Sequence, residues 1–255
     1  MMRRRTILLL MCLFFCSSCV SVPKAPSGPL LPSNEILGSI NTSIPRQDIC
    51  HVVAPSETLW RISKMYDVSI EAIMKANNLE SATSIKVGQS LVIPNAAALR
   101  PVVTLYKNNK WKYIIIHHSA TDIGNALSLN QLHLRRGFIN GLGYHFIIDN
   151  GTFGKADGQL EASPRWIKQM DGAHCKASGM NQVGIGVCLV GNFSKEKVSE
   201  KQMNTLIFLV NTLRKYYNIP EKNIMGHGQV PGAATECPGL NFPWEEFWTR
   251  LKRGN

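Results

Sequence analysis

The sequence predicts an α/β protein in which a small module precedes one larger, layered domain. Three apolar runs that are typical of buried strands, at residues 112–117, 144–149 and 183–191, alternate with stretches of helical periodicity. A strand–helix–helix–strand pattern precedes them at residues 49–94. With 255 residues, 44% of them hydrophobic, the chain is long enough to form one good core and a second, smaller one.

The chain begins with the features of an export signal, residues 1–19. A basic cluster at residues 3–5 precedes an apolar run at residues 7–15 that is too short to span a membrane comfortably. The following "CSSC" resembles a lipoprotein processing box, which implies that Cys19 becomes the lipid-bearing first residue of the mature chain. Ordinary cleavage to a soluble exported protein is the alternative. Both predict a location in the periplasm or cell envelope, and only lipidation predicts a membrane anchor.

Two connecting segments are expected to lack regular structure. Residues 20–48 are rich in Ser, Pro, Asn and Gly with few bulky side chains, so they cannot bury enough surface to fold and predict a flexible tether. Residues 95–110 are expected to be a linker, short enough to keep the two bodies close but without evident rigidity.

The small module at residues 49–94 is predicted to be βααβ. Residues 50–53 and 89–94 form its strands, and the apolar side chains between them recur at helical spacing. The stretch "SETLWRISKMYDVSIEAIMKANNL" followed by "VGQSLVIP" resembles a LysM domain over its whole length, except that Ser-Glu stands at positions 56–57, where Gly-Asp is usual. LysM domains bind glycans that contain N-acetylglucosamine, such as peptidoglycan or chitin.

The LysM resemblance implies a sugar groove between two loops. Alternatively, Trp60 and Leu79 are core residues of a very small module, and for Trp60 we favour that interpretation. The glycan-binding residues that the resemblance implies are Glu57, Thr58, Leu59, Asn77, Asn78 and Leu79.

The larger domain, residues 111–252, places helices around its strands. Residues 128–137 form a helix that ends in Gly. The longest helix begins at Ser199, where a Gln three residues later completes a capping box, and ends before Pro220. A last helix opens at Pro243, a favourable position in a first turn.

Histidine and cysteine side chains suggest a reactive site in this domain. His227 and Cys237 stand ten positions apart (237 − 227) in the Gly- and Pro-rich stretch "GHGQVPGAATECPG". They are either two ligands of one metal, a nucleophile with its base, or two unrelated core residues. A catalytic zinc takes three protein ligands, and His117 or His118 can supply the third from a strand end. Strand periodicity alone does not say which of the two faces the site.

Four motifs connect this domain to a known family. "IIIHHSATD", "GLGYHFIIDNGTFG", "GAHCKASGMNQVGIGVCLVGNF" and "GHGQVPGAATECPGLNF" resemble, in order and spacing, the zinc amidases that include a phage amidase-lysozyme and the peptidoglycan-recognition proteins. The resemblance implies a central mixed β-sheet flanked by helices. It also implies a Zn²⁺ ion held by His117, His227 and Cys237, with His118 at a position that does not bind metal.

The same resemblance implies further site residues. Tyr144 matches a tyrosine near the zinc, and Thr235 matches a threonine of the catalytic peptidoglycan-recognition proteins, where the phage enzyme has a lysine. A threonine hydroxyl does not titrate near pH 7, so Thr235 is expected to act by hydrogen bonding. His174 and Asn181 match groove residues that contact the peptide stem or the muramyl group.

Together these observations predict a zinc-dependent N-acetylmuramoyl-L-alanine amidase that a LysM domain holds on peptidoglycan. The balance of 28 Lys and Arg against 17 Asp and Glu, a net charge of +11, favours a polyanionic partner such as an acidic wall polymer. We expect no nucleic-acid partner, since the chain carries no base-reading signature. We also expect a monomer.

Two alternatives remain at this stage. One is a non-catalytic peptidoglycan-binding protein, because family members that lose the cysteine ligand become receptors. The other is a Cys/His hydrolase with Cys237 as nucleophile and His227 as base. In that case nothing evident near Cys237 lowers the thiol pKa.

Overall fold

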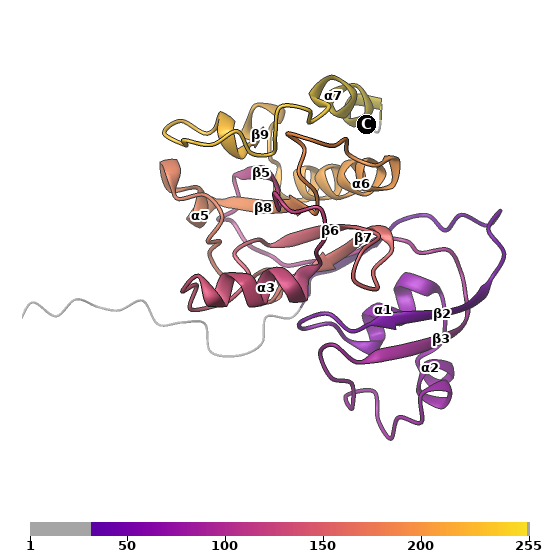
Figure 1. Cartoon of the computed structure of the whole chain (residues 1–255). Helices are drawn as coiled ribbons and strands as arrows, with labels where there is room; N and C mark the ends of the chain where they lie inside the picture. The colour runs from indigo at the N-terminus through magenta and orange to yellow at the C-terminus, as the bar shows by residue number, and fades with distance from the viewer. Residues whose placement is uncertain (1–31, 254–255) are drawn as a thin grey trace, which may run out of the picture.

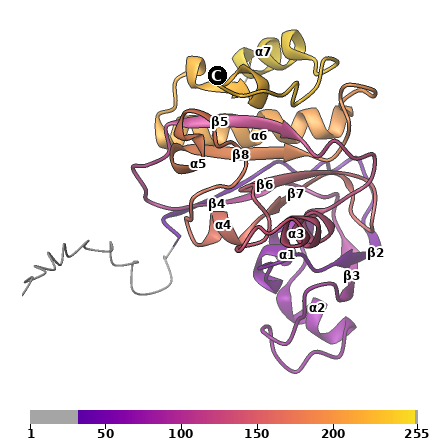
Figure 2. The ribbon, with the colours of Figure 1, turned by 60° about the vertical axis from the view of Figure 1, so that its left-hand side comes forward.

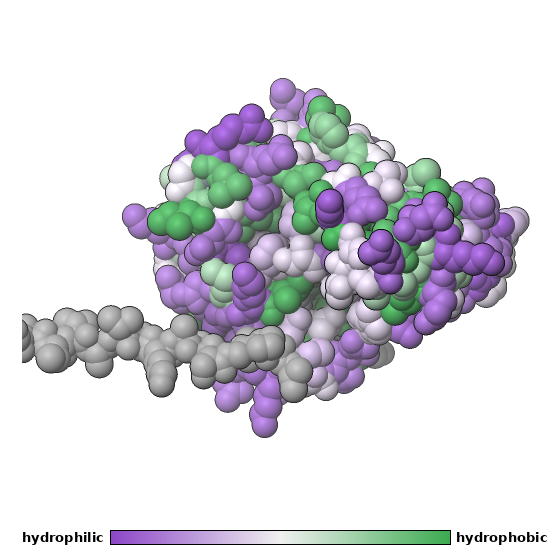
Figure 3. All heavy atoms as spheres, turned by 90° about the horizontal axis from the view of Figure 1, so that it is seen from below, coloured by the Kyte–Doolittle hydropathy of each residue, from purple (hydrophilic) through white to green (hydrophobic). Residues whose placement is uncertain are grey.

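The computed structural model describes residues 32–253. The predicted export signal, the predicted lipidation site Cys19 and the first part of the predicted tether lie outside these residues. Within the described range, no helix is both long and apolar enough to cross a membrane. On the face shown in Figure 3, hydrophobic residues form small separate patches among hydrophilic ones.

The small module has the predicted strand–helix–helix–strand order. Strand β2 (Gln47–Val52) pairs antiparallel with β3 (Ser90–Ala96), and helices α1 (Leu59–Tyr66) and α2 (Ile70–Ala76) lie between them in the sequence. Each helix begins after a hydroxyl side chain that accepts a backbone N–H of the first turn. The core consists of fully buried side chains from both helices and β3, namely Leu59, Ile62, Met65, Ile73, Leu91 and Ile93.

The larger domain is built on a five-stranded mixed sheet with the strand order β7-β6-β8-β5-β9. Strands β6, β8, β5 and β9 run parallel, and the edge strand β7 is antiparallel to β6. This confirms the predicted mixed sheet, and β7 and β9 add to the predicted strands. The five strands are β5 (Tyr113–His118), β6 (Phe146–Asn150), β7 (Asp157–Ala162), β8 (Gly184–Leu189) and β9 (Ile224–Gly226).

Helices cover both faces of this sheet (Figures 1 and 2). Helix α3 (Ala126–Arg135) packs on one face, and α6 (Glu200–Tyr217) and α7 (Trp244–Arg253) pack on the other. Because side chains alternate along a strand, Ile116 of β5 points towards α6 and α7, whereas His117 points to the side of α3. The remaining helical turns are α4 (Pro164–Ile167), α5 (Met180–Val183), η1 (Ala177–Gly179), η2 (Glu221–Asn223) and η3 (His227–Gln229).

The segments expected to be a flexible tether and a linker contain a strand pair. Strand β1 (Asn34–Leu37) pairs antiparallel with β4 (Val102–Leu105). Val102 is buried in the core of the small module, whereas Val103 is buried in the core of the larger domain. The expected linker therefore includes a strand that both cores share, because its alternate side chains point to opposite faces.

Candidate metal centre

Three distant segments bring His117, His227 and Cys237 together. His117 lies near the end of β5 and is 1% exposed. His227 opens turn η3 directly after β9, and Cys237 follows in the next loop. Because β5 and β9 are neighbouring parallel strands, their carboxyl ends meet at one edge of the sheet. The ligand atoms of the three residues all lie within 4.8 Å of one another.

The geometry of these atoms fits a zinc ion. Cys237 Sγ lies 3.7 Å from His117 Nδ1. Zn–S bonds of about 2.3 Å and Zn–N bonds of about 2.1 Å at a tetrahedral angle would place the two atoms about 3.6 Å apart. Two imidazoles and one thiolate also leave the fourth coordination position for water or substrate.

His118 faces the opposite side of β5. Its Nδ1 accepts a hydrogen bond from the backbone N–H of Phe193 at 3.2 Å. Its own backbone N–H points at Cys237 Sγ, 3.4 Å away, and so helps to hold the sulfur. The alternation along β5 therefore places His117 with the other two expected ligands and His118 away from them.

The loop between His227 and Cys237 folds back on itself. Gly228 N donates to Cys237 O at 2.7 Å, and a Cβ on Gly228 would lie only 2.3 Å from Thr235 O. Only glycine allows this close approach. Thr235 is exposed, and its Oγ1 accepts a hydrogen bond from Cys237 N at 3.2 Å. The loop thus fixes the Cys237 thiol, an expected metal ligand, and the Thr235 hydroxyl, which is expected to act by hydrogen bonding.

His174 lies directly behind His117. His117 Nε2 and His174 Nδ1 are 3.0 Å apart, and His174 Nε2 lies 3.2 Å from Gly184 O. His117 Nε2–H can donate to His174 Nδ1 while His174 Nε2–H donates to the Gly184 carbonyl, an arrangement that would leave Nδ1 of His117 free to hold a metal. Gly186 leaves room for this ring, since a Cβ there would lie 2.4 Å from His174 Cδ2. His174 is 8% exposed, so it offers little surface to a substrate.

This contact could not be read from the sequence, because the two histidines lie 57 positions apart and the motif resemblance assigns His174 to the substrate groove. Asn181, the other predicted groove residue, is half-buried. Its Oδ1 accepts the backbone N–H groups of His174 at 2.8 Å and Cys175 at 2.9 Å. Asn181 therefore shapes the loop that carries His174, and the substrate contacts of both residues stay predictions.

Tyr144 lies beside the expected ligands. Its ring centroid is 5.1 Å from that of His117. Burial, together with the neighbouring Cys188 and Cys237 thiols, raises the pKa of Tyr144 well above its ordinary value. The side chain also hydrogen-bonds to Cys188, a buried thiol of β8. Tyr144 therefore keeps its proton at neutral pH.

Burial also decides the protonation of the expected ligands. It lowers the pKa of His117 well below its ordinary value and lowers that of His227, so both imidazoles are neutral at pH 7. Neutral imidazole is the form that binds metal. Burial raises the pKa of the Cys237 thiol to about 12. Without a metal this thiol stays protonated, and binding of a metal would release its proton.

The first predicted glycan-binding loop is partly turned inward. The Glu57 side chain is 3% exposed, lies 2.7 Å from His51 Nε2 and accepts the Ala54 N–H at 2.8 Å. Thr58 is exposed and caps α1, whereas Leu59 is fully buried in the core of the module. Thr58 therefore offers more surface to a ligand than its two neighbours.

The second predicted loop shows a similar division. The Asn77 side chain bonds to the backbone of β3, where it accepts from Val92 N at 2.8 Å and donates to Val92 O at 2.7 Å. Asn78 is exposed, and Leu79 packs half-buried against the core of the module. The structure thus places Thr58 and Asn78 at the surface and gives the other four residues internal contacts.

Comparison with known proteins assigns both domains. The N-acetylmuramoyl-L-alanine amidase family profile matches residues 107–240, and the LysM domain profile matches residues 51–94. The endolysin of Enterobacteria phage K11 is 30% identical over 149 residues, which cover 55% of this chain and 88% of the endolysin. Peptidoglycan-recognition protein 2 of Holotrichia diomphalia is 32% identical over 101 residues, 36% of this chain and 49% of that protein.

Among solved structures, the N-acetylmuramoyl-L-alanine amidase LysC from Clostridium intestinale URNW is 33% identical, with a TM-score of 0.47, and the match covers 56% of this chain and 86% of that one. The family profile spans more than half of the 255 residues. The chain therefore belongs to the N-acetylmuramoyl-L-alanine amidase family and carries a LysM domain at its N-terminal side.

Proposed function

We propose that this protein is a zinc-dependent amidase that cleaves the bond between N-acetylmuramic acid and L-alanine in peptidoglycan. The observation that carries the proposal is the convergence of the ligand atoms of His117, His227 and Cys237 to within 4.8 Å. Membership of the amidase family supports peptidoglycan as the substrate. The LysM domain supports the same target, because it would hold the enzyme on the glycan and raise the local substrate concentration.

A zinc ion at this position would activate a water molecule and polarise the amide carbonyl. The Tyr144 hydroxyl keeps its proton, and on leaving its hydrogen bond with Cys188 it could donate to an oxygen on which negative charge develops. Thr235 uses its oxygen to accept from Cys237 N, which leaves its own proton free to donate to the substrate. His174 and Asn181 are proposed to contact the peptide stem or the muramyl group, in addition to the internal contacts that they make.

The sequence features outside the described residues complete the proposal. We propose that the protein is exported to the periplasm or cell envelope and that lipidation of Cys19 attaches it to a membrane. We propose a monomer with peptidoglycan as its partner and no nucleic-acid ligand.

The test is the digestion of purified peptidoglycan by the wild type and by Cys237→Ala. We expect mass spectrometry to find free stem peptides only with the wild type, and metal analysis to find about one zinc per wild-type chain and a much smaller amount in the variant. Cys50→Ala is the matched control, because Cys50 is an exposed free cysteine of the small module. If zinc-loaded wild type releases no free stem peptide, the proposal fails.

The two alternatives give different results. A non-catalytic binder would retain peptidoglycan in a pull-down without releasing stem peptides. A Cys/His hydrolase would work without metal, but burial raises the pKa of Cys237 to about 12, which leaves too little thiolate at neutral pH to act as a nucleophile.

A further inference from the structure

Ionisable side chains of both domains meet in the interior of the molecule. We call His51, Glu57 and Arg61 of the LysM domain, together with Asp149, Lys155 and Glu161 of the amidase domain, the interdomain cluster. Five of them are at most 7% exposed, and the side chain of Glu57 is 3% exposed. Burial of ionisable groups costs free energy unless they have partners. The cluster is therefore a specific contact between the two domains rather than an incidental one.

Two cations of the cluster donate across the domain boundary. Lys155 Nζ of the amidase domain donates to Val52 O at the end of β2, 2.6 Å away. Arg61 Nη2 on helix α1 donates to Leu160 O of β7 at 3.0 Å. Each domain thus supplies one buried cation that bonds to the backbone of the other. Removal of either charge would leave its partners buried without compensation.

The acidic members balance these two cations. Lys155 Nζ also lies 2.9 Å from Glu161 Oε2, and the charge of Glu57 acts on both Lys155 and Arg61. Burial and the neighbouring Glu161 carboxylate raise the pKa of Asp149 well above its ordinary value, so Asp149 is neutral. The charges of Glu57 and Glu161 therefore face those of Lys155 and Arg61.

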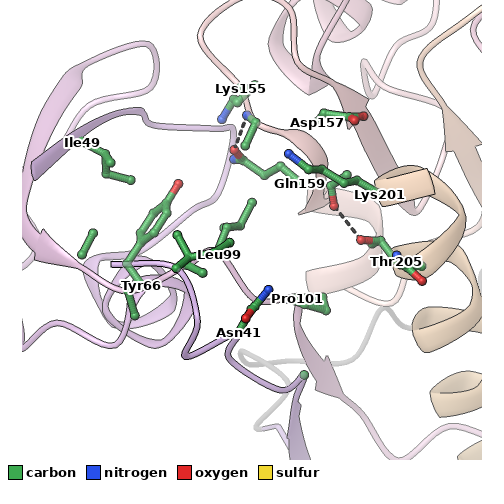
Figure 4. A pocket seen from close by; sticks show the side chains of 18 of the residues that line it. Asn41, Ile49, Tyr66, Leu99, Pro101, Lys155, Asp157, Gln159, Lys201 and Thr205 are labelled. Carbon is green, nitrogen blue, oxygen red and sulfur yellow. Dashed lines mark hydrogen bonds between the residues drawn. The ribbon is translucent and has the colours of Figure 1, made fainter. Parts of the chain in front are cut away.

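The backbone also approaches closely at this boundary. Gly154 has a φ of +72°, and a Cβ there would lie 3.0 Å from Val52 Cγ2. Beside this contact, a cavity of about 720 Å³ separates the domains, with Tyr66 and Leu99 on one side and Lys201 and Thr205 on the other (Figure 4). The domains are therefore held at defined points, namely the cluster, the Gly154 contact and the shared strand β4, rather than over one continuous surface.

Glu161 links the cluster to the metal centre. Its Oε1 accepts the backbone N–H of Ala126, the first residue of α3, at 2.7 Å, where a negative charge is favourable at a helix N-terminus. Ala126 and Leu129 of α3 pack in one apolar cluster with Cys188, and Tyr144 packs against this cluster. The same carboxylate thus contacts the cation that holds the LysM domain and the helix that supports Tyr144.

We propose that the LysM domain is a fixed structural part of the catalytic domain, whose docking through the interdomain cluster sets the position of α3 and of the wall that carries Tyr144. Glu161 is the positioning residue in this arrangement. Glycan bound by the LysM domain would consequently lie at a fixed distance and orientation from the metal centre. This last consequence rests on the proposed function, whereas the docking itself does not.

Hydrogen exchange of the zinc-loaded full chain tests the docking. Arg61→Met and Lys155→Met keep the side-chain stem and remove the buried cation from opposite domains. We expect both variants to raise the exchange rates of the α3 amides by about tenfold or more, because the helix loses its fixed support. Lys197→Met is the matched control, since Lys197 is exposed and lies outside the cluster. Unchanged α3 exchange in folded Arg61→Met would overturn the proposal.

Calorimetry of the wild type gives a second result that needs no variant. One cooperative transition that includes both domains is expected, because their cores share β4 and the cluster. Two separate transitions would overturn the proposal. Neither measurement uses activity, so a failure of the proposed amidase reaction remains distinguishable from a failure of the docking.

Discussion

At the scale of single residues, the contact between His117 and His174 fixes the orientation of the His117 imidazole. An imidazole that binds metal through one nitrogen needs a partner for the other nitrogen, and His174 Nδ1 provides it at 3.0 Å. The ring of His174 is fixed in turn by Gly184 O. His174 therefore determines which nitrogen of His117 would be available to a metal.

His174→Ala should lower the affinity for zinc about 10–100-fold, the usual effect of losing such a partner. His174→Asn should recover part of the loss, because its amide oxygen can stand close to the position of Nδ1. Competition with a chromophoric chelator measures both affinities. Equal zinc affinity of His174→Ala and the wild type would show that His174 does not support His117.

Glu57 should make the free energy of unfolding depend on pH in the acid range. Burial would raise its pKa, but the hydrogen bond and charge of His51 lower it to about 2 from an ordinary 4.5. A carboxylate with a lowered folded-state pKa contributes stability above its unfolded pKa and loses it as the pH falls through the folded pKa. The free energy of unfolding should therefore fall by about 3 kcal/mol through this group between about pH 5 and pH 2.

Denaturant unfolding of Glu57→Gln across this range checks the acid dependence, and the variant should show a flatter curve than the wild type. Glu71→Gln, at an exposed position in the first turn of α2, is the control and should keep the wild-type slope. An identical slope for Glu57→Gln would contradict the assignment.

At the scale of elements, β4 makes a prediction of its own. Val102→Ala removes methyl groups from the core of the small module, and Val103→Ala removes them from the core of the larger domain. Each substitution should lower the free energy of unfolding by about 1–3 kcal/mol. Because one strand carries both valines, both variants should shift the same unfolding transition, followed by urea and tryptophan fluorescence. A separate transition of the small module that responds to Val102→Ala alone would contradict a shared strand.

The elements also show what the sequence can predict. Helix α6 and the apolar strands β5, β6 and β8 follow from periodicity, because each buries one clear face or both faces. Strand β7 contains a buried Gln159 and Glu161, so its pattern reads as polar, and Arg61 of the other domain donates to Leu160 O in the same strand. Strand β9 has three residues, too few to produce a periodic signal.

The same limit applies to the site. Motifs at fixed spacing identify His117, His227 and Cys237 as a group, and the structure brings them together. The support behind them could not be found in this way. The contact of His117 with His174 joins residues 57 positions apart, and it depends on how the loop that carries His174 folds against β5.

At the scale of the whole molecule, treatment with a chelator should distinguish a zinc amidase from a Cys/His hydrolase. Dialysis against a chelator should abolish release of stem peptides, and added zinc should restore it, since the Cys237 thiol has a pKa of about 12 without metal. The measurement is mass spectrometry of the digest before and after zinc is added. Full activity in chelator would favour a thiol nucleophile instead.

The shared strand β4 has a consequence for the exchange of domains between proteins. A recombination point after residue 103 would place the donor's Val103 in the recipient's amidase core, and a point before residue 102 would place the recipient's Val102 in the donor's small-module core. A different sugar-binding module would therefore have to fit the small-module side of β4 and supply a cation that takes the place of Arg61 at Leu160 O. We therefore expect the two domains to be exchanged more easily together than one at a time.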